Sequence, residues 1–246
     1  MNVSKRQFKG VHGMKRVILL FFTAAALGVL VMPAGADEYW LTYEGNDLPE
    51  NEGWERHWGN DEGAQEGDGA IRTLEGGILT MDSLYDLRVY DYACHYLYGE
   101  VDPDPGELFV AECRVKIDQA IGDMYDSTFS ICSDDRMQLA FGLFPDRIES
   151  IWEDNVTLSV SPDMFHEYRV FSWDMLTYEL YIDGDLVHEG TFWQGWLDSK
   201  LAWGDGVRGA ASLAHWDYVH FGVVPEPSSL TMLLAIYACM RHTRIH

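Results

Sequence analysis

The sequence is short of basic residues, and this shortage limits what the protein can bind. It has 17 Lys and Arg against 40 Asp and Glu in 246 residues. Five of the basic residues lie in the first 36 positions and two in the last 19, where acids are absent, so the middle carries 10 basic and 40 acidic residues, a net charge of −30. Such a charge repels phosphate backbones and anionic lipids, and it favours cations and basic partners. We therefore predict no nucleic-acid partner.

The common short catalytic motifs are also missing. The sequence has no Gly-x-Ser-x-Gly, no His-Glu-x-x-His and no phosphate-binding loop. Hydrolysis of a glycoside needs two carboxylates about 5–10 Å apart. The nearest acidic grouping, 100–104 (EVDPD), contains Pro103 and is followed by Pro105, which indicates a loop and not a strand. We predict a protein without enzymatic activity, and a secreted glycoside hydrolase or lyase is the alternative.

The first 36 residues have the pattern of a secretory signal peptide. Five Lys and Arg precede an apolar run over 17–32, and Ala34-Gly35-Ala36 supplies the small residues of a cleavage site. We predict cleavage at this site, recognised through Ala34 and Ala36, and a mature chain that begins near Asp37. An uncleaved anchor helix is the alternative, although the apolar run is at the short end for a bilayer span.

The last 23 residues combine three features in a fixed order. Pro225-Glu226-Pro227 is followed by an apolar run over 230–240 and by a basic end with Arg241 and Arg244. This order resembles the bacterial PEP-CTERM sorting signal. The resemblance implies export, processing by an exosortase-type membrane protease, and delivery to the cell envelope or an extracellular matrix. The 11 apolar residues would span only ~16 Å of a ~30 Å hydrocarbon core, and a final amphipathic helix packed on the domain is the alternative.

Residues 37–223 show the pattern of short strands separated by turns. Residues 110–117 alternate between polar and apolar side chains, as a half-buried strand does. Asp183-Gly184 between two strand-like runs is a strong hairpin signal, since a tight two-residue turn needs positive φ. About a dozen strands and no convincing helix predict an all-β, two-sheet antiparallel sandwich. The expected strands are 39–43, 54–58, 78–82, 85–92, 108–117, 127–132, 137–144, 147–152, 157–160, 167–173, 178–183, 185–191 and 216–223.

The runs 166–170 (HEYRV) and 178–187 (YELYIDGDLV) resemble the meander of concanavalin A-like lectin/glucanase domains, including laminin G-like members. Residues 216–221 (WDYVHF) resemble the closing strand, which pairs near the N-terminal one. The resemblance implies a jelly roll whose concave face often binds glycans in relatives. Laminarinase-type members carry Glu-x-Asp-x-Glu on one strand, and this sequence has no such motif. The fold hosts lectins, hydrolases, lyases and adhesion modules, so it does not identify an activity.

An acidic loop over 60–69 (NDEGAQEGDG) is a candidate calcium site, because hard oxygen ligands on a flexible backbone suit Ca²⁺. A solvated acidic loop is the other interpretation, since the spacing is not that of an EF-hand. The candidate ligands are Asn60, Asp61, Glu62, Glu66 and Asp68.

Tryptophan is abundant, with nine residues, and its flat apolar rings suit the faces of sugars. Four of the nine lie around the meander and the run that follows it, and we predict a ligand-binding role for one or more of them, with core packing as the alternative. These four are Trp173, Trp193, Trp196 and Trp203.

Cysteine is scarce. Removal of the tail would take Cys239 and leave Cys94, Cys113 and Cys132. An exported location permits a disulfide, for example between Cys113 and Cys132, and unpaired core cysteines are equally compatible with the sequence.

The resulting hypothesis is an exported protein of the bacterial envelope or matrix that binds glycans. Its expected partners are an exosortase-type protease and a polysaccharide, and Ca²⁺ is its single candidate cofactor. Contact with the membrane is expected only through the signal and the tail. A purely structural surface protein is a further alternative.

Overall fold

The computed structural model describes residues 38–57, 71–84, 94–98, 101, 103–104, 107–122, 125–152, 156–197, 199–205 and 211–224. Asp37–Glu226 forms one compact unit. Within the described part of the chain, no helix has the length and apolar character that a membrane span requires. Several predicted features lie outside the described residues: the signal-cleavage residues Ala34 and Ala36, the motif Pro225-Glu226-Pro227, the acidic loop 60–69 and the expected strand 85–92.

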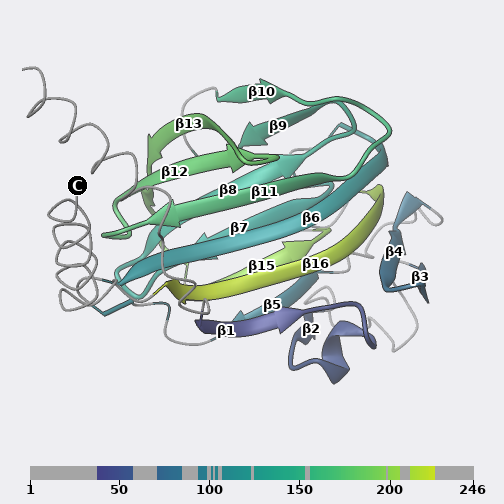
Figure 1. The fold of residues 1–246 in the computed structure, drawn as a ribbon, viewed down its shortest axis with the longest axis horizontal. Coiled ribbons are helices and arrows are strands. Elements are labelled where there is room, and N and C mark those ends of the chain that lie inside the picture. Colours follow the sequence, from purple (N-terminus) through teal and green to yellow (C-terminus); the bar gives the residue numbers. More distant parts are fainter. Residues whose placement is uncertain are drawn as a thin grey trace, which may run out of the picture. The chain divides into compact units, whose positions relative to one another are not determined.

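Two antiparallel sheets form the domain, one layer behind the other in Figure 1. The order in the first, called sheet A, is β13-β12-β11-β6-β16-β4-β3, and β1 also pairs with β16. The bounds in sheet A are β1 Glu38–Tyr43, β3 Ile71–Glu75, β4 Ile78–Asp82, β6 Leu108–Ala120, β11 His166–Ser172, β12 Thr177–Ile182, β13 Asp185–Thr191 and β16 Ser212–Val224.

The second sheet, called sheet B, has the order β10-β9-β8-β7-β15-β5-β2, and β14 also pairs with β8. The bounds in sheet B are β2 Glu55–His57, β5 Cys94–Tyr98, β7 Thr128–Cys132, β8 Met137–Leu143, β9 Arg147–Ser150, β10 Thr157–Ser159, β14 Trp193–Gln194 and β15 Lys200–Gly204. A single turn of 3₁₀-helix, η1 Pro49–Asn51, follows β1. The predicted all-β jelly-roll sandwich is confirmed.

The two longest strands, β6 and β16, lie next to each other in sheet A. Their register runs from Ser212 opposite Ala120 to Val224 opposite Leu108. The other edge of β16 pairs with β1, where Tyr43 lies opposite Val219. This pairing confirms the prediction that the closing strand lies beside the first one.

The meander of β11, β12 and β13 also agrees with the sequence pattern. Tyr178, Leu180 and Ile182 all face the core and are buried. Asp183 and Gly184 form the two-residue turn with φ values of 53° and 87°, as expected for a type I′ hairpin, which requires positive φ at both central positions.

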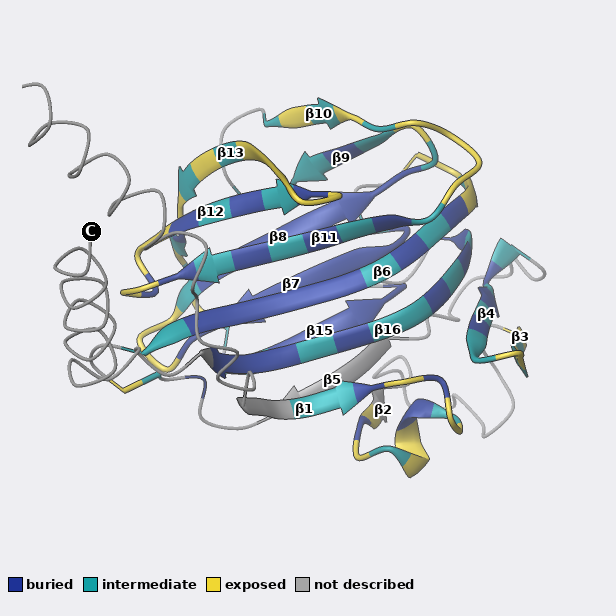
Figure 2. Ribbon diagram, in the orientation of Figure 1, coloured by how far each residue is buried: buried dark blue, intermediate teal, exposed yellow. Residues whose placement is uncertain are grey.

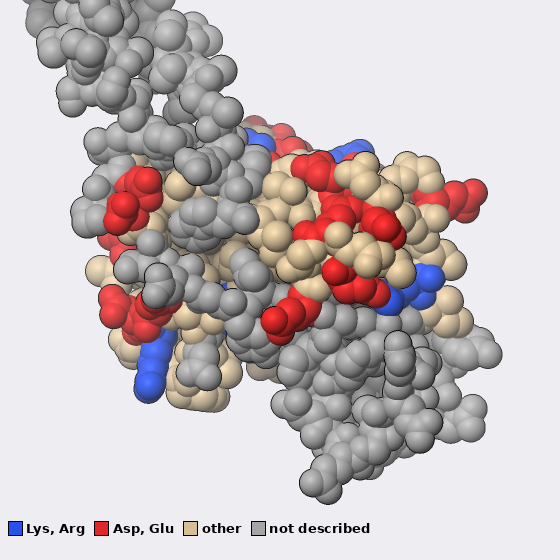
Figure 3. All heavy atoms as spheres, turned by 90° about the horizontal axis from the view of Figure 1, so that it is seen from below, with Lys and Arg blue, Asp and Glu red and all other residues tan. Residues whose placement is uncertain are grey.

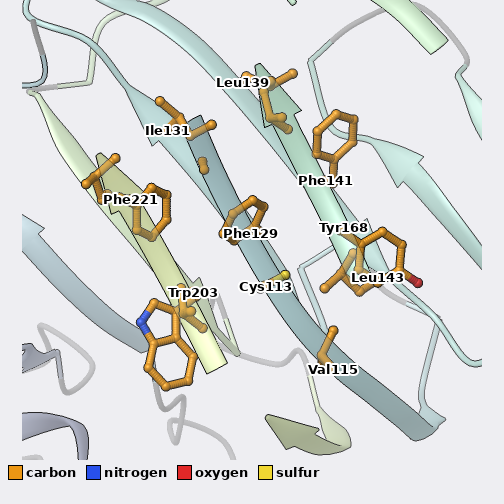
Figure 4. Packing of buried hydrophobic residues seen from close by; sticks show 14 of the residues in the cluster. Cys113, Val115, Phe129, Ile131, Leu139, Phe141, Leu143, Tyr168, Trp203 and Phe221 are labelled. Carbon is orange, nitrogen blue, oxygen red and sulfur yellow. The ribbon is translucent and has the colours of Figure 1, made fainter. Parts of the chain in front are cut away.

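Aromatic rings fill the space between the sheets. Trp203 on β15 is 0% exposed, and its ring lies 5.1 Å from Tyr43, 5.7 Å from Trp54 and 5.0 Å from Trp216. Phe129 of sheet B stacks on Phe221 of sheet A at 5.2 Å, and Figure 4 shows both rings among the buried hydrophobic side chains. The predicted ligand role of Trp203 is therefore corrected, because its indole is buried in the core.

Burial is greatest in the middle of each sheet and falls toward the edges. Figure 2 shows long buried stretches on β7, β8 and β15, whereas β13 at the edge of sheet A is largely exposed. The described surface is strongly acidic, and Figure 3 shows much more Asp and Glu than Lys and Arg on the face seen from below.

Cys113 and Cys132 are both free and buried. Cys113 belongs to the core side of β6, whereas Cys132 lies on β7 in the other sheet. On β7, Phe129 and Ile131 face the core, so Cys132, one residue after Ile131, points to the opposite face. The two thiols do not form the disulfide that the sequence allowed, which leaves the interpretation of unpaired cysteines.

Candidate functional site

Three tryptophans meet at the edge of β8 in sheet B, and we call Trp152, Trp193 and Trp196 the tryptophan platform. Trp152 stacks on Trp193 with ring centroids 6.3 Å apart and an angle of 24° between the planes. Trp193 meets Trp196 edge to face at 5.4 Å and 85°. Trp196 is 70% exposed. The platform therefore presents the ring of Trp196 to solvent and supports it with Trp193, which in turn stacks on Trp152.

Strand pairing brings these rings together. Trp193 lies opposite Gln138 in the register of β14 with β8, and Ile151 donates its N–H to the carbonyl of Ala140 farther along the same edge. Gln138 faces away from the core, because its neighbour Leu139 faces into it. Directly opposite residues of paired strands project to the same side, so Trp193 lies on the outer face of sheet B.

A buried amide holds the loop that carries Trp196. Gln138 is 1% exposed, and with its oxygen facing the loop it accepts the N–H of Trp196 at 3.0 Å and of Leu197 at 2.6 Å. Gly195 donates its N–H to the carbonyl of Arg136 at 2.9 Å. A Cβ at Gly195 would lie 2.1 Å from the amide carbon of Gln138, so a larger residue there would force the Gln138 side chain to shift.

Trp173 lies at a separate pocket of about 280 Å³, beside the turn between β11 and β12. Asp174 shapes this turn, because its Oδ1 accepts the N–H groups of Leu176 and Thr177, each at 2.8 Å. Partial burial raises the pKa of Asp174, but these hydrogen bonds outweigh it and the net pKa is lowered. The pocket is lined by Pro103, Asp104, Ser133, Asp135, Met137, Trp173, Asp174, Met175 and Leu176.

The turn 133–137 separates the pocket from the platform and contacts both. Asp135 and Met137 line the pocket. On the other side, the carbonyl of Asp135 accepts the side-chain N–H of Gln194 at 3.1 Å, and Met137 lies opposite Gln194 in the strand register. The two aromatic groups therefore belong to one continuous edge of the domain.

A second dense group of charged side chains lies on the outer face of sheet A. Glu112 is 5% exposed, and its carboxylate contacts Arg169 Nε at 2.5 Å and His220 Nδ1 at 3.0 Å. Arg169 also reaches Glu167 at 3.3 Å, and Glu167 accepts the hydroxyl of Tyr218 at 2.7 Å. All four carboxylate oxygens of Glu112 and Glu167 have a protein partner, which is typical of a structural ion-pair network.

The structure thus divides the four predicted tryptophans. Trp193 and Trp196 lie together, Trp173 lies at its own pocket, and Trp203 is in the core. Trp152 was missed, because it ends a strand-like run and nothing in the local sequence indicates its contact with Trp193. The predicted calcium ligands are not described, and among the residues that are, no group of three or more His, Cys, Asp and Glu is arranged to hold a metal ion.

Comparison with known proteins identifies no relative by sequence: no protein-family model matches the chain, and no curated protein does. Solved structures do match. An endo-1,3-β-glucanase from Streptomyces sioyaensis is 13% identical, with a TM-score of 0.51 and coverage of 78% of this chain and 98% of that one. A β-glucanase from Bacillus licheniformis is 15% identical, with a TM-score of 0.47 and coverage of 74% and 96%.

The prediction of a protein without enzymatic activity is corrected by these matches. It rested on absent motifs, whereas a matched structure with this fold, at a TM-score of 0.51, is an endo-1,3-β-glucanase. A missing motif is therefore no ground for excluding enzymatic activity on this fold. At 13% identity the likeness itself shows the fold alone. That fold is the concanavalin A-like, lectin/glucanase jelly roll.

Proposed function

We propose that this protein binds a polysaccharide through the tryptophan platform. The observation that carries the proposal is Trp196, whose ring is 70% exposed yet held in place by Trp193 and by the buried amide of Gln138. A rigid exposed ring loses little conformational entropy on binding and offers an apolar face to the C–H groups of a sugar.

The choice of the first ligand comes from the fold. The matched structure with the highest TM-score reported above is an endo-1,3-β-glucanase, so a soluble β-1,3-glucan is the polysaccharide to test first. The acidic surface in Figure 3 fits a neutral or cationic ligand better than an anionic one.

Binding is tested by isothermal titration of the full-length chain with β-1,3-glucan oligosaccharides. Trp196→Ala is expected to weaken binding about tenfold, which corresponds to about 1.4 kcal/mol. Leu186→Ala is the control, because Leu186 is an exposed apolar residue on β13, away from the platform. Unchanged affinity of Trp196→Ala would contradict the proposal. The same mixtures are assayed for new reducing ends, whose release would assign hydrolysis in addition to binding.

We also propose that the chain is exported and sorted to the cell envelope or matrix. The proposal is supported by the signal-like residues 1–36 and by Pro225-Glu226-Pro227 with the apolar run and basic end that follow. An exosortase-type protease is the expected processing partner. In a bacterium that has this protease, replacing the three motif residues by alanine should leave an uncleaved C-terminus, as measured by intact mass. Normal processing of this variant would refute the role of the motif.

A further inference from the structure

The pocket beside Trp173 combines an exposed aromatic ring with several carboxylates. Trp173 is 56% exposed and Leu176 is 53% exposed, so one wall of the pocket is apolar and open to solvent. Asp104, Asp135 and Asp174 also line it, and all three residues are exposed. None of the described residues that line the pocket is basic.

We infer that this pocket binds a positively charged amino-sugar residue, with the ring of the sugar on Trp173 and its ammonium group facing the carboxylates. The inference rests on the proposed function, because it names the kind of sugar unit that a second site on the same edge would take. An ammonium group beside an indole gains a cation–π attraction, and carboxylates beside it add charge-assisted hydrogen bonds.

The arrangement suits an ammonium group better than a metal ion. A calcium ion needs six to eight oxygen ligands at about 2.3–2.6 Å, and the carboxylates of the described residues do not gather in threes as a metal ion requires. They are instead distributed around the pocket on three segments: one before β6, one before β8 and one before β12. An ammonium group needs only one or two of these carboxylates at hydrogen-bond distance and no coordination shell.

The size of the pocket and its position next to the tryptophan platform favour a sugar over a protein segment as its ligand. A volume of about 280 Å³ lies just below the ~300–1,000 Å³ that ligand pockets usually have, which suits a single sugar residue. The turn 133–137 joins the pocket to the platform through Asp135 and Gln194. The pocket is therefore a site next to the tryptophan platform and is lined by different residues.

The test compares a cationic and a neutral ligand with the same backbone: a hexamer of β-1,4-linked glucosamine and the same hexamer with every amine acetylated. Each is titrated into the full-length chain at a mildly acidic pH, where the free amines are protonated. We expect the glucosamine hexamer to bind about tenfold more tightly and added salt to reduce this preference. Trp173→Ala and Asp135→Asn should each remove most of the preference, and both positions are exposed, so both variants should fold.

Asp185→Asn is the charge-matched control, because Asp185 is exposed at the start of β13 and does not line the pocket. Equal affinity for the two hexamers, no binding of the glucosamine hexamer, or an equal loss in Asp185→Asn and Asp135→Asn would overturn the inference. A lysine hexapeptide that binds at least as tightly as the glucosamine hexamer, and that loses the same affinity in Trp173→Ala, would overturn the inference and indicate a basic protein segment as the ligand. Binding of β-1,3-glucan tests the proposed function independently of this pocket. Trp196→Ala should weaken that binding, and Trp173→Ala should leave it unchanged.

Discussion

The side-chain amide of Gln138 occupies the space that a side chain at Gly195 would need. The two residues lie on different segments, with Gln138 in β8 and Gly195 directly after β14. The distance of 2.1 Å from an added Cβ to the amide carbon of Gln138 is far below any allowed contact. Because the same amide accepts the N–H groups of Trp196 and Leu197, this close approach fixes the position of the exposed ring.

Gly195→Ala is therefore expected to displace the loop and to weaken β-1,3-glucan binding about tenfold, equivalent to about 1.4 kcal/mol. The Trp emission spectrum should change as well, because Trp196 would leave its edge-to-face contact with Trp193. As a control, Gly195→Ala is also made in a chain that carries Gln138→Ala, which lacks the amide that the new methyl group would meet. If the clash is the cause, Gly195→Ala reduces the affinity less in that chain than in the original chain. Equal reductions in both chains would refute the clash.

His166 and Asp183 predict a dependence of stability on acid pH. His166 is buried, with Nδ1 at 2.7 Å from Asp183 Oδ2 and Nε2 at 2.7 Å from the carbonyl of Ser161. Both ring nitrogens therefore lie at hydrogen-bond distance from oxygen atoms. Partial burial raises the pKa of Asp183. Hydrogen bonds from the Glu167 N–H and from His166 lower it by more, so the net pKa lies below its ordinary value.

A lowered pKa in the folded state means that Asp183 stabilises the fold above the unfolded pKa of about 3.9, and that this contribution is lost as the pH falls further. Asp183→Asn should lower the free energy of unfolding by about 1 kcal/mol at neutral pH and should flatten its decline below about pH 4. Asparagine tolerates the positive φ of this position. Urea titrations at several pH values measure both effects, with Asp163→Asn as the control, and an unchanged acid profile would argue against this role of Asp183.

Loss of Arg169 should destabilise the fold strongly. Arg169→Leu leaves the Glu112 carboxylate, which is buried, without its guanidinium partner, and breaking a buried pair in this way costs about 3 kcal/mol. Arg147→Leu is the control, because its partners Asp146 and Glu149 are more exposed and an exposed pair contributes less than about 1 kcal/mol. Urea unfolding measures both variants, and similar small losses would contradict the special role of Glu112.

The two buried thiols should resist alkylation until the domain unfolds. Burial raises the pKa of Cys113, and it raises that of Cys132 to about 12 against a small opposing effect of Lys200. The reactive thiolate is therefore scarce at neutral pH. Iodoacetamide followed by peptide mapping should leave both residues unlabelled in native buffer and label both in urea. Labelling of either in native buffer would show that its strand opens, and a recovered Cys113–Cys132 peptide pair would disprove their separation.

The local features of the fold could be read from the sequence because neighbouring residues decide them. The turn at Asp183-Gly184 follows from two positions that accept positive φ, and the buried face of β12 follows from the alternation of Tyr178, Leu180 and Ile182. The two-sheet architecture followed in turn from many short alternating runs.

Contacts between distant segments were decided only by the tertiary structure. The run 200–204 (KLAWG) was not predicted as a strand, because it is only five residues long and ends in glycine. In the structure it forms β15, which lies between β5 and β7 in sheet B and buries Trp203. Trp152 meets Trp193 because β9 and β14 line the same edge of β8. The sequence by itself therefore determined that this protein is a β-sandwich rich in tryptophan. Strand pairing, which joins residues far apart in the chain, decided which rings support the core and which face solvent.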